Sequence, residues 1–124
     1  MDLPSPVRVV AALTVAYSVA ITVAPKVLAG PCQMLDAQGE VPPQIETLVR
    51  STGVRDAALA AVLLVSHPGP ASRTLIGARV VSDAADALWF GLLPIPADAK
   101  AKVAGAAAGW ATIEALAWWA DRSR

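Results

Sequence analysis

The amino-acid sequence predicts an all-α protein, a four-transmembrane-helix antiparallel bundle with a charged interior. Hydrophobic residues make up 56% of the 124 residues and charged residues only 16%, against about 25% charged residues in a typical soluble domain. Alanine, the strongest helix former, is the commonest residue. Prolines and glycines divide the chain into four blocks, each close to the roughly 20 residues that cross a bilayer. These observations together predict one domain over residues 1–124.

The first expected helix covers residues 6–24. It starts with a residue that can cap the helix, followed by proline at the first helical position (Ser5-Pro6). An uncharged apolar run follows, and Pro25 ends it. A cleaved signal peptide is the alternative for this block, because the residues before Cys32 are similar to a lipobox. A proline directly before that cysteine interrupts the lipobox pattern and favours the membrane span.

The other three expected helices cover residues 44–66, 71–93 and 97–120. Each contains four charged side chains, and a charge at the centre of a spanning helix costs about 2.5–3.5 kcal/mol on insertion. A soluble alanine-rich helical bundle is therefore the alternative fold. Two aromatic pairs, which begin at Trp89 and Trp118 near the ends of their helices, are typical of membrane interfaces and favour spanning helices.

The composition also indicates where the chain resides and which classes it does not belong to. Ten basic residues balance ten acidic ones, so no basic excess is present for binding nucleic acid. A single cysteine and a single histidine argue against a metal site, and the sequence contains no cofactor-binding motif. Four spans would make this a multi-pass protein of the cell membrane, in contact with the lipid bilayer. A small excess of basic residues beside the termini favours cytoplasmic termini.

The third expected helix carries a polar stripe. Its residues follow the spacing i, i+3, i+4, i+7 and therefore share one face, namely Arg79, Ser82, Asp83 and Asp86. Lipid cannot solvate such a face, so it should point into the bundle. Depths estimated at about 1.5 Å per residue predict three ion pairs across helices: Arg50 with Asp86, Arg55 with Asp83, and Arg79 with Glu114 or Asp56. One carboxylate is left over, and it should either bind a proton, with a raised pKa, or face water.

These charges have two interpretations. They are either structural ion pairs that fix helix register, or a polar pocket for proton transfer or for the head group of a lipophilic molecule. Under the second interpretation the candidate catalytic residues are Asp83, Asp86, Glu114 and Asp56. The candidate substrate-binding residues are Arg50, Arg55, Arg79, Tyr17 and Trp110.

Three functions are compatible with this pattern. The first is binding of a lipophilic small molecule in the polar pocket. The second is a membrane-embedded acid–base enzyme without a cofactor, such as an epoxide hydrolase, isomerase or cyclase acting on a hydrophobic substrate. The third is an accessory or assembly subunit, or a homodimer, that uses the small-residue ridge at Gly105 and Gly109 for close helix packing.

The second expected helix contains the sequence Arg50-x-x-Gly53-x-Arg55-Asp56-x-x-x-Ala60. This resembles the R-x-x-G-x-R-D-x-x-x-G signature of a family of small four-helix bacterial membrane proteins of unknown function. The first helix ending at Ala-Pro and the acidic third helix are also similar, and Ala60 stands where the family has glycine. The resemblance implies four spans, and it implies no activity.

Overall fold

A computed structural model describes residues 5–92 and 95–123. These residues form five helices, α1 (Pro6–Val23), α2 (Lys26–Ala29), α3 (Pro43–Val65), α4 (Pro70–Leu92) and α5 (Ala97–Arg122). The four long helices begin within one residue of the predicted starts. The sequence did not predict α2, a single helical turn in the segment expected to be a loop.

Local sequence explains where the long helices begin. The hydroxyl of Ser5 accepts a hydrogen bond from the backbone N–H of Arg8 at 3.2 Å and so caps α1. A proline occupies the first helical position of α1, α3 and α4, where its missing N–H has no intrahelical partner to lose. Proline and the capping serine therefore place three of the four starts.

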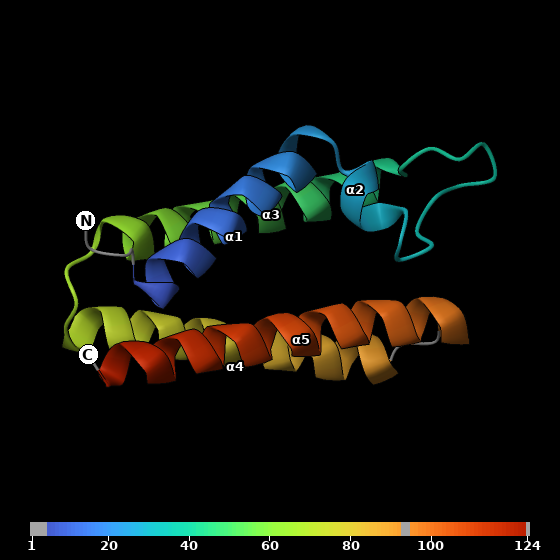
Figure 1. The fold of residues 1–124 in the computed structure, drawn as a ribbon. Helices are drawn as coiled ribbons and strands as arrows, with labels where there is room; N and C mark the ends of the chain where they lie inside the picture. Colours follow the sequence, from blue (N-terminus) through green and yellow to red (C-terminus); the bar gives the residue numbers. More distant parts are fainter. Residues whose placement is uncertain (1–4, 93–94, 124) are drawn as a thin grey trace.

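The long helices form two layers of two antiparallel helices each. α1 lies beside α3, α4 lies beside α5, and the two layers meet most closely at the end where α1 begins and α5 ends (Figure 1). The buried apolar cluster at this junction takes residues from all four long helices: Val7, Val10 and Ala11 of α1, Leu63 of α3, Ile76 of α4 and Ala117 of α5. The core therefore sits toward one end of the molecule.

Gly53 allows α1 and α3 to pack closely. A β-carbon built at this position would lie 2.8 Å from the carbonyl oxygen of Ser18 and would also clash with the hydroxyl of Thr22. The carbonyl oxygen belongs to the backbone of α1, so rotation of a side chain cannot relieve the contact. The glycine of the α3 motif thus has a packing role that the sequence alone did not reveal.

We expect Gly53→Ala to lower the free energy of unfolding by about 1–3 kcal/mol, because the two helices must move apart. Urea unfolding of the purified chain, followed by circular dichroism, measures this. The matched control is Gly105→Ala in α5, whose β-carbon would meet no described atom within 4 Å. That change should stabilise the helix by about 0.5–1 kcal/mol. Equal stability of the two variants would contradict close packing at Gly53.

The predicted four-transmembrane-helix bundle is wrong. Within the described residues, one helix is long and apolar enough to cross a membrane, and it is α1, near the N-terminus. Core helices of soluble proteins and signal sequences share that composition. The multi-pass prediction required the charges of α3 and α4 to pair in an interior, yet the side chains of Arg50 and Arg55 are 45% and 61% exposed. A bundle of helices cannot bury charged side chains that are this exposed, so lipid would contact them.

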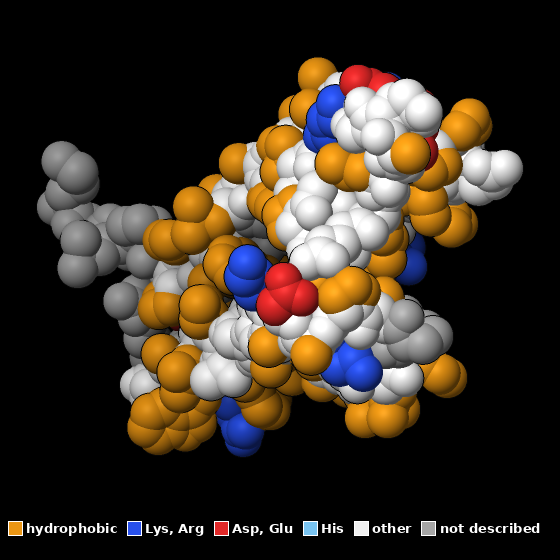
Figure 2. Space-filling model, turned by 90° about the vertical axis from the view of Figure 1, so that its right-hand side faces the viewer, with side chains coloured by type: hydrophobic (Ala, Val, Ile, Leu, Met, Phe, Trp, Pro, Cys, Tyr) orange, Lys and Arg blue, Asp and Glu red, His pale blue; other side chains and the backbone are white. Residues whose placement is uncertain are grey.

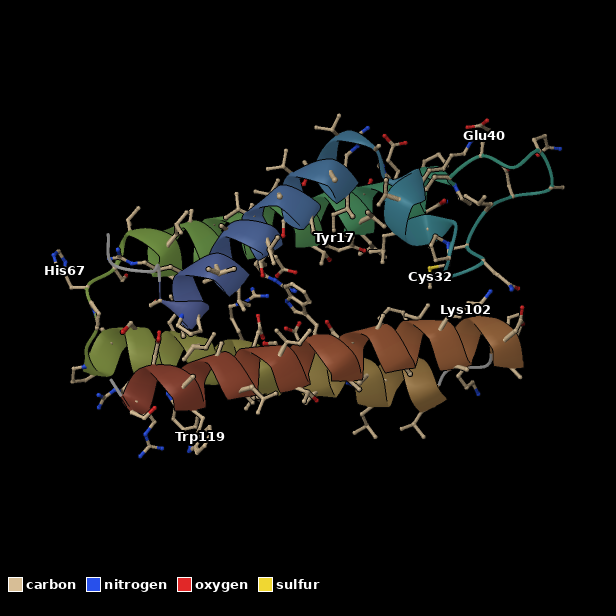
Figure 3. The ribbon with its side chains drawn as sticks, viewed as in Figure 1. Tyr17, Cys32, Glu40, His67, Lys102 and Trp119 are labelled. Carbon is tan, nitrogen blue, oxygen red and sulfur yellow. The ribbon has the colours of Figure 1, made fainter. Side chains whose placement is uncertain are left out.

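A large share of the apolar surface is left uncovered. The accessible surface is 7669 Å², compared with about 6,200 Å² for a compact monomer of this mass. Figure 2 shows hydrophobic side chains spread over the visible face with few charges between them. Trp119 is among the exposed residues, on the side of α5 that faces away from α1 and α3 (Figure 3). Two thin layers that meet at one end have too little interior to enclose these side chains.

Candidate functional site

A buried ion pair joins α4 to α5. The Nε of Arg79 donates a hydrogen bond to Oε1 of Glu114 at 2.9 Å, and the two side chains are only 6% and 1% exposed. The antiparallel arrangement of α4 and α5 brings the two residues side by side. This confirms the predicted pairing of Arg79 with Glu114. A charge pair with so little solvent depends on its partners for stability.

Asp83 completes the cluster one helical turn after Arg79. Its Oδ2 lies 3.6 Å from Nη2 of Arg79, close enough for an ion pair but too far for a hydrogen bond. Two buried carboxylate oxygens, Oδ2 of Asp83 and Oε2 of Glu114, have no hydrogen-bond partner in the described part of the chain. The cluster therefore contains two carboxylates, one guanidinium and two oxygens that could still accept a hydrogen bond.

The electrostatic balance favours a proton on Asp83. Burial, followed by hydrogen bonding to and repulsion from Glu114, raises the pKa of Asp83 from 3.8 to about 7, although Arg79 acts in the opposite direction. A proton on Asp83 would let this carboxyl donate to one of the free oxygens. The sequence analysis predicted that one carboxylate would be left over and would either bind a proton, with a raised pKa, or face water. The raised pKa of Asp83 agrees with the first of these outcomes.

A cavity of about 90 Å³ adjoins the cluster between α3 and α4. Its polar lining comes from Arg55, Asp56, Arg79, Ser82 and Asp83, and its apolar lining from Leu59, Leu75 and Ala78. Arg55 is paired with Asp56 at 3.1 Å, so this arginine does not neutralise Asp83 as predicted. The cavity gives Asp83 a path to molecules outside the protein.

The other two predicted cross-helix pairs are wrong. Arg50 bonds to Glu46 one turn earlier in its own helix, at 2.8 Å, and to the carbonyl oxygen of Thr22 at 2.6 Å. Asp86 is exposed and takes no part in the ion pairs found among residues 5–92 and 95–123. Arg50 and Arg55 therefore pair with groups of their own helix or of the neighbouring α1 instead of with α4.

Two aromatic candidates also lie away from the cavity. Trp110 packs against the apolar core cluster, and Tyr17 is an exposed residue of α1. Neither belongs to the cavity lining. Of the nine candidate residues, the structure brings five together, namely Arg55, Asp56, Arg79, Asp83 and Glu114.

The apolar side of the cavity was missed by the sequence analysis. Leu59 stands four residues after Arg55, and Leu75 four residues before Arg79, so each shares a helix face with a charged lining residue. That spacing was the signal in the sequence that could have identified the two leucines as lining residues. Alone it could not show that the two faces meet.

Comparisons with known proteins add no relatives. No family model, curated protein or solved structure matches the chain. The family resemblance of the α3 motif therefore stays a prediction. Among the described residues, no group of three or more histidine, cysteine, aspartate or glutamate side chains could hold a metal ion.

Proposed function

We propose that the chain binds a lipophilic small molecule whose polar head enters the cavity beside Asp83. The observation that carries the proposal is Asp83, whose side chain lines the cavity and whose buried Oδ2 has no donor among the described residues. Unsatisfied buried polar groups are rare in folded proteins and call for a specific explanation. When Asp83 has lost the proton that could join it to Glu114, a bound polar head group would supply the missing partner.

The volume of the cavity indicates that such a ligand would lie partly in the cavity and partly on the protein surface. The cavity, at about 90 Å³, is well below the roughly 300–1,000 Å³ of sites that enclose a whole drug-sized ligand. Only a head group fits inside, and the remainder must lie on the surface. Leu59 of the lining and Val62 one turn further are both exposed on α3, and they offer an apolar path for that remainder. A ligand of this kind partitions into membranes, which agrees with a lipid bilayer as partner.

The proposal is tested with three twelve-carbon amphiphiles that differ only in the head group: dodecanol, dodecanoate and dodecylamine. At least one, held below its micelle concentration, should raise the Tm of the purified full chain, because a ligand that binds only the folded state stabilises it. Ala78→Phe, which fills the cavity, should remove the effect. Ala84→Phe on the same helix, outside the lining, is the matched control and should retain it.

An acid–base enzyme is the second candidate, and the pKa of Asp83 favours it. General acids and bases are most effective when their pKa lies near the working pH, and Asp83 has a pKa of about 7 beside a cavity. In this function Asp83 would give its proton to the oxygen of a bound epoxide while a C–O bond of the ring breaks and a water molecule adds to the carbon, and the proton lost by that water would return to Asp83. Binding requires only the cavity, whereas turnover requires in addition that Asp83 exchange its proton with the bound molecule.

The accessory-subunit or homodimer function depends on the ridge at Gly105 and Gly109. Both glycines are exposed, and a β-carbon at either would meet no described atom within 4 Å. They therefore do not serve packing within the described chain, and their face is open to another helix. This supports the ridge as a contact surface but names no partner.

A further inference from the structure

The cluster around Arg79 has a surplus of hydrogen-bond acceptors. Arg79 donates to Oε1 of Glu114, and its contact with Asp83 is longer than a hydrogen bond. Glu114 is 99% buried, and its Oε2 has no donor within residues 5–92 and 95–123, nor does Oδ2 of Asp83. Asp83 lines the cavity and Glu114 does not, so a ligand with N–H groups could donate to the Asp83 carboxylate, whereas a ligand that brings only acceptors could not.

When Asp83 is ionised, the cluster also has a surplus of negative charge. α3 contributes one arginine and one aspartate, Arg55 and Asp56, which neutralise each other at 3.1 Å. α4 contributes Arg79 and Asp83 with Asp86 one turn beyond, and α5 contributes Glu114. The single charged residue of α1, Arg8, bonds to the carbonyl oxygen of Ser66 in the turn after α3. Since Arg79 is paired with Glu114, Asp83 is left without a full counter-charge, and a cation is favoured over an anion.

Given the binding function proposed above, we propose that the cavity takes the protonated amine of an alkyl amine, with its N–H groups donating to Asp83 and its alkyl chain lying against Leu59 and Leu75. The ammonium group has three donors and no acceptor, which suits the Asp83 carboxylate of the lining. Its small size suits a cavity of about 90 Å³. The apolar lining on α3 and α4 then covers the first methylenes.

The same reasoning excludes two related ligands. A fatty acid would place its carboxylate beside Asp83 with no unpaired arginine in the lining. A quaternary alkylammonium carries the positive charge but has no N–H group, and its three methyl groups enlarge the head. Comparing these ligands with a primary amine therefore distinguishes three contributions to binding: hydrogen-bond donation, positive charge and apolar contact.

The experiment measures the affinity of the purified full chain for dodecylamine, dodecyltrimethylammonium, dodecanoate and dodecanol by calorimetry at pH 8, where Asp83 is ionised. Dodecylamine should bind at least tenfold more tightly than the other three. Asp83→Asn should weaken its binding at least tenfold. Asp98→Asn, which removes the same charge about 24 Å along α5 from Glu114, is the matched control and should leave the affinity unchanged.

Each outcome has a defined meaning. If dodecanol or dodecanoate binds as tightly as dodecylamine and Ala78→Phe still prevents binding, the amine is wrong and the binding function stands. If dodecyltrimethylammonium matches dodecylamine, or Asp83→Asn binds normally, N–H donation to Asp83 is overturned. If none of the four ligands binds, or if Ala78→Phe has no effect, the binding function itself fails. A supporting result also requires weaker binding at pH 5.5, where Asp83 holds its own proton.

Discussion

Replacing Arg79 with methionine is expected to lower the free energy of unfolding by about 3–5 kcal/mol at pH 8, the cost of leaving buried charges without their partner. In the wild type the guanidinium lies 2.9 Å from Glu114 and 3.6 Å from Asp83. Without it, two neighbouring carboxylates are buried together with no counter-charge. They must either bind protons or draw water into the junction of α4 and α5, and both responses cost stability.

A triple variant distinguishes the loss of charge balance from the loss of packing. Arg79→Met combined with Asp83→Leu and Glu114→Met replaces all three charged groups by apolar side chains of similar size. Such replacements of complete buried ion clusters are often neutral or stabilising, so the triple variant should recover most of the stability lost in the single variant. Urea unfolding at pH 8 measures both. A loss below 1 kcal/mol in Arg79→Met would show that the cluster is better solvated than its burial indicates.

The helix boundaries were predictable because local chemistry determines them. The serine cap at Ser5 and the prolines at the first positions of α1, α3 and α4 act within one turn of chain. The single turn of α2 was not predictable in this way, because four residues cannot show helical periodicity. Local signals thus gave where the long helices lie along the chain and nothing about how they pack.

Within the candidate site, the sequence correctly predicted only the ion pair between residues on two helices that are antiparallel neighbours. Arg79 and Glu114 meet because α4 and α5 lie side by side along their length, so counting residues from the connecting turn gives their levels to within about one helical turn. The same count failed for Arg50 and Arg55, because α3 and α4 lie in different layers. Their nearest acids are local, Glu46 in the preceding turn and the adjacent Asp56.

The membrane prediction failed for a related reason. It treated every charge of α3 and α4 as an interior charge that a partner must neutralise. In the structure only the Arg79 cluster is buried, while Arg50 and Arg55 remain exposed. Hydropathy alone selects α1 among the described helices, and the sequence offers no measure of which charged faces a partner helix will cover.

The stability of the protein is expected to fall as the pH rises from about 4 to about 7, and Asp83 should be the main cause. The pKa of Asp83 is raised from 3.8 to about 7 in the folded chain, mainly by burial and then by Glu114. Between these values the folded protein holds a proton that the unfolded chain has released. Folding therefore binds a proton, and the contribution of this group is fully present below pH 4 and lost as the pH passes 7.

The slope expected from one proton is up to about 1.4 kcal/mol per pH unit within this window. Asp86 is exposed but partly desolvated, and this desolvation, followed by repulsion from Asp83, raises its pKa, so it adds to the slope in the same direction. Asp83→Asn removes the titrating group and the repulsion it exerts on Asp86, so the curve of unfolding free energy against pH should flatten. The measurement is urea unfolding at half-unit intervals from pH 4 to pH 8, with Asp98→Asn as the charge-matched control that keeps the slope. An equal slope in Asp83→Asn and the wild type would mean that Asp83 is already ionised in the folded protein, and the donor for its free oxygen would then have to come from a ligand or from water at every pH.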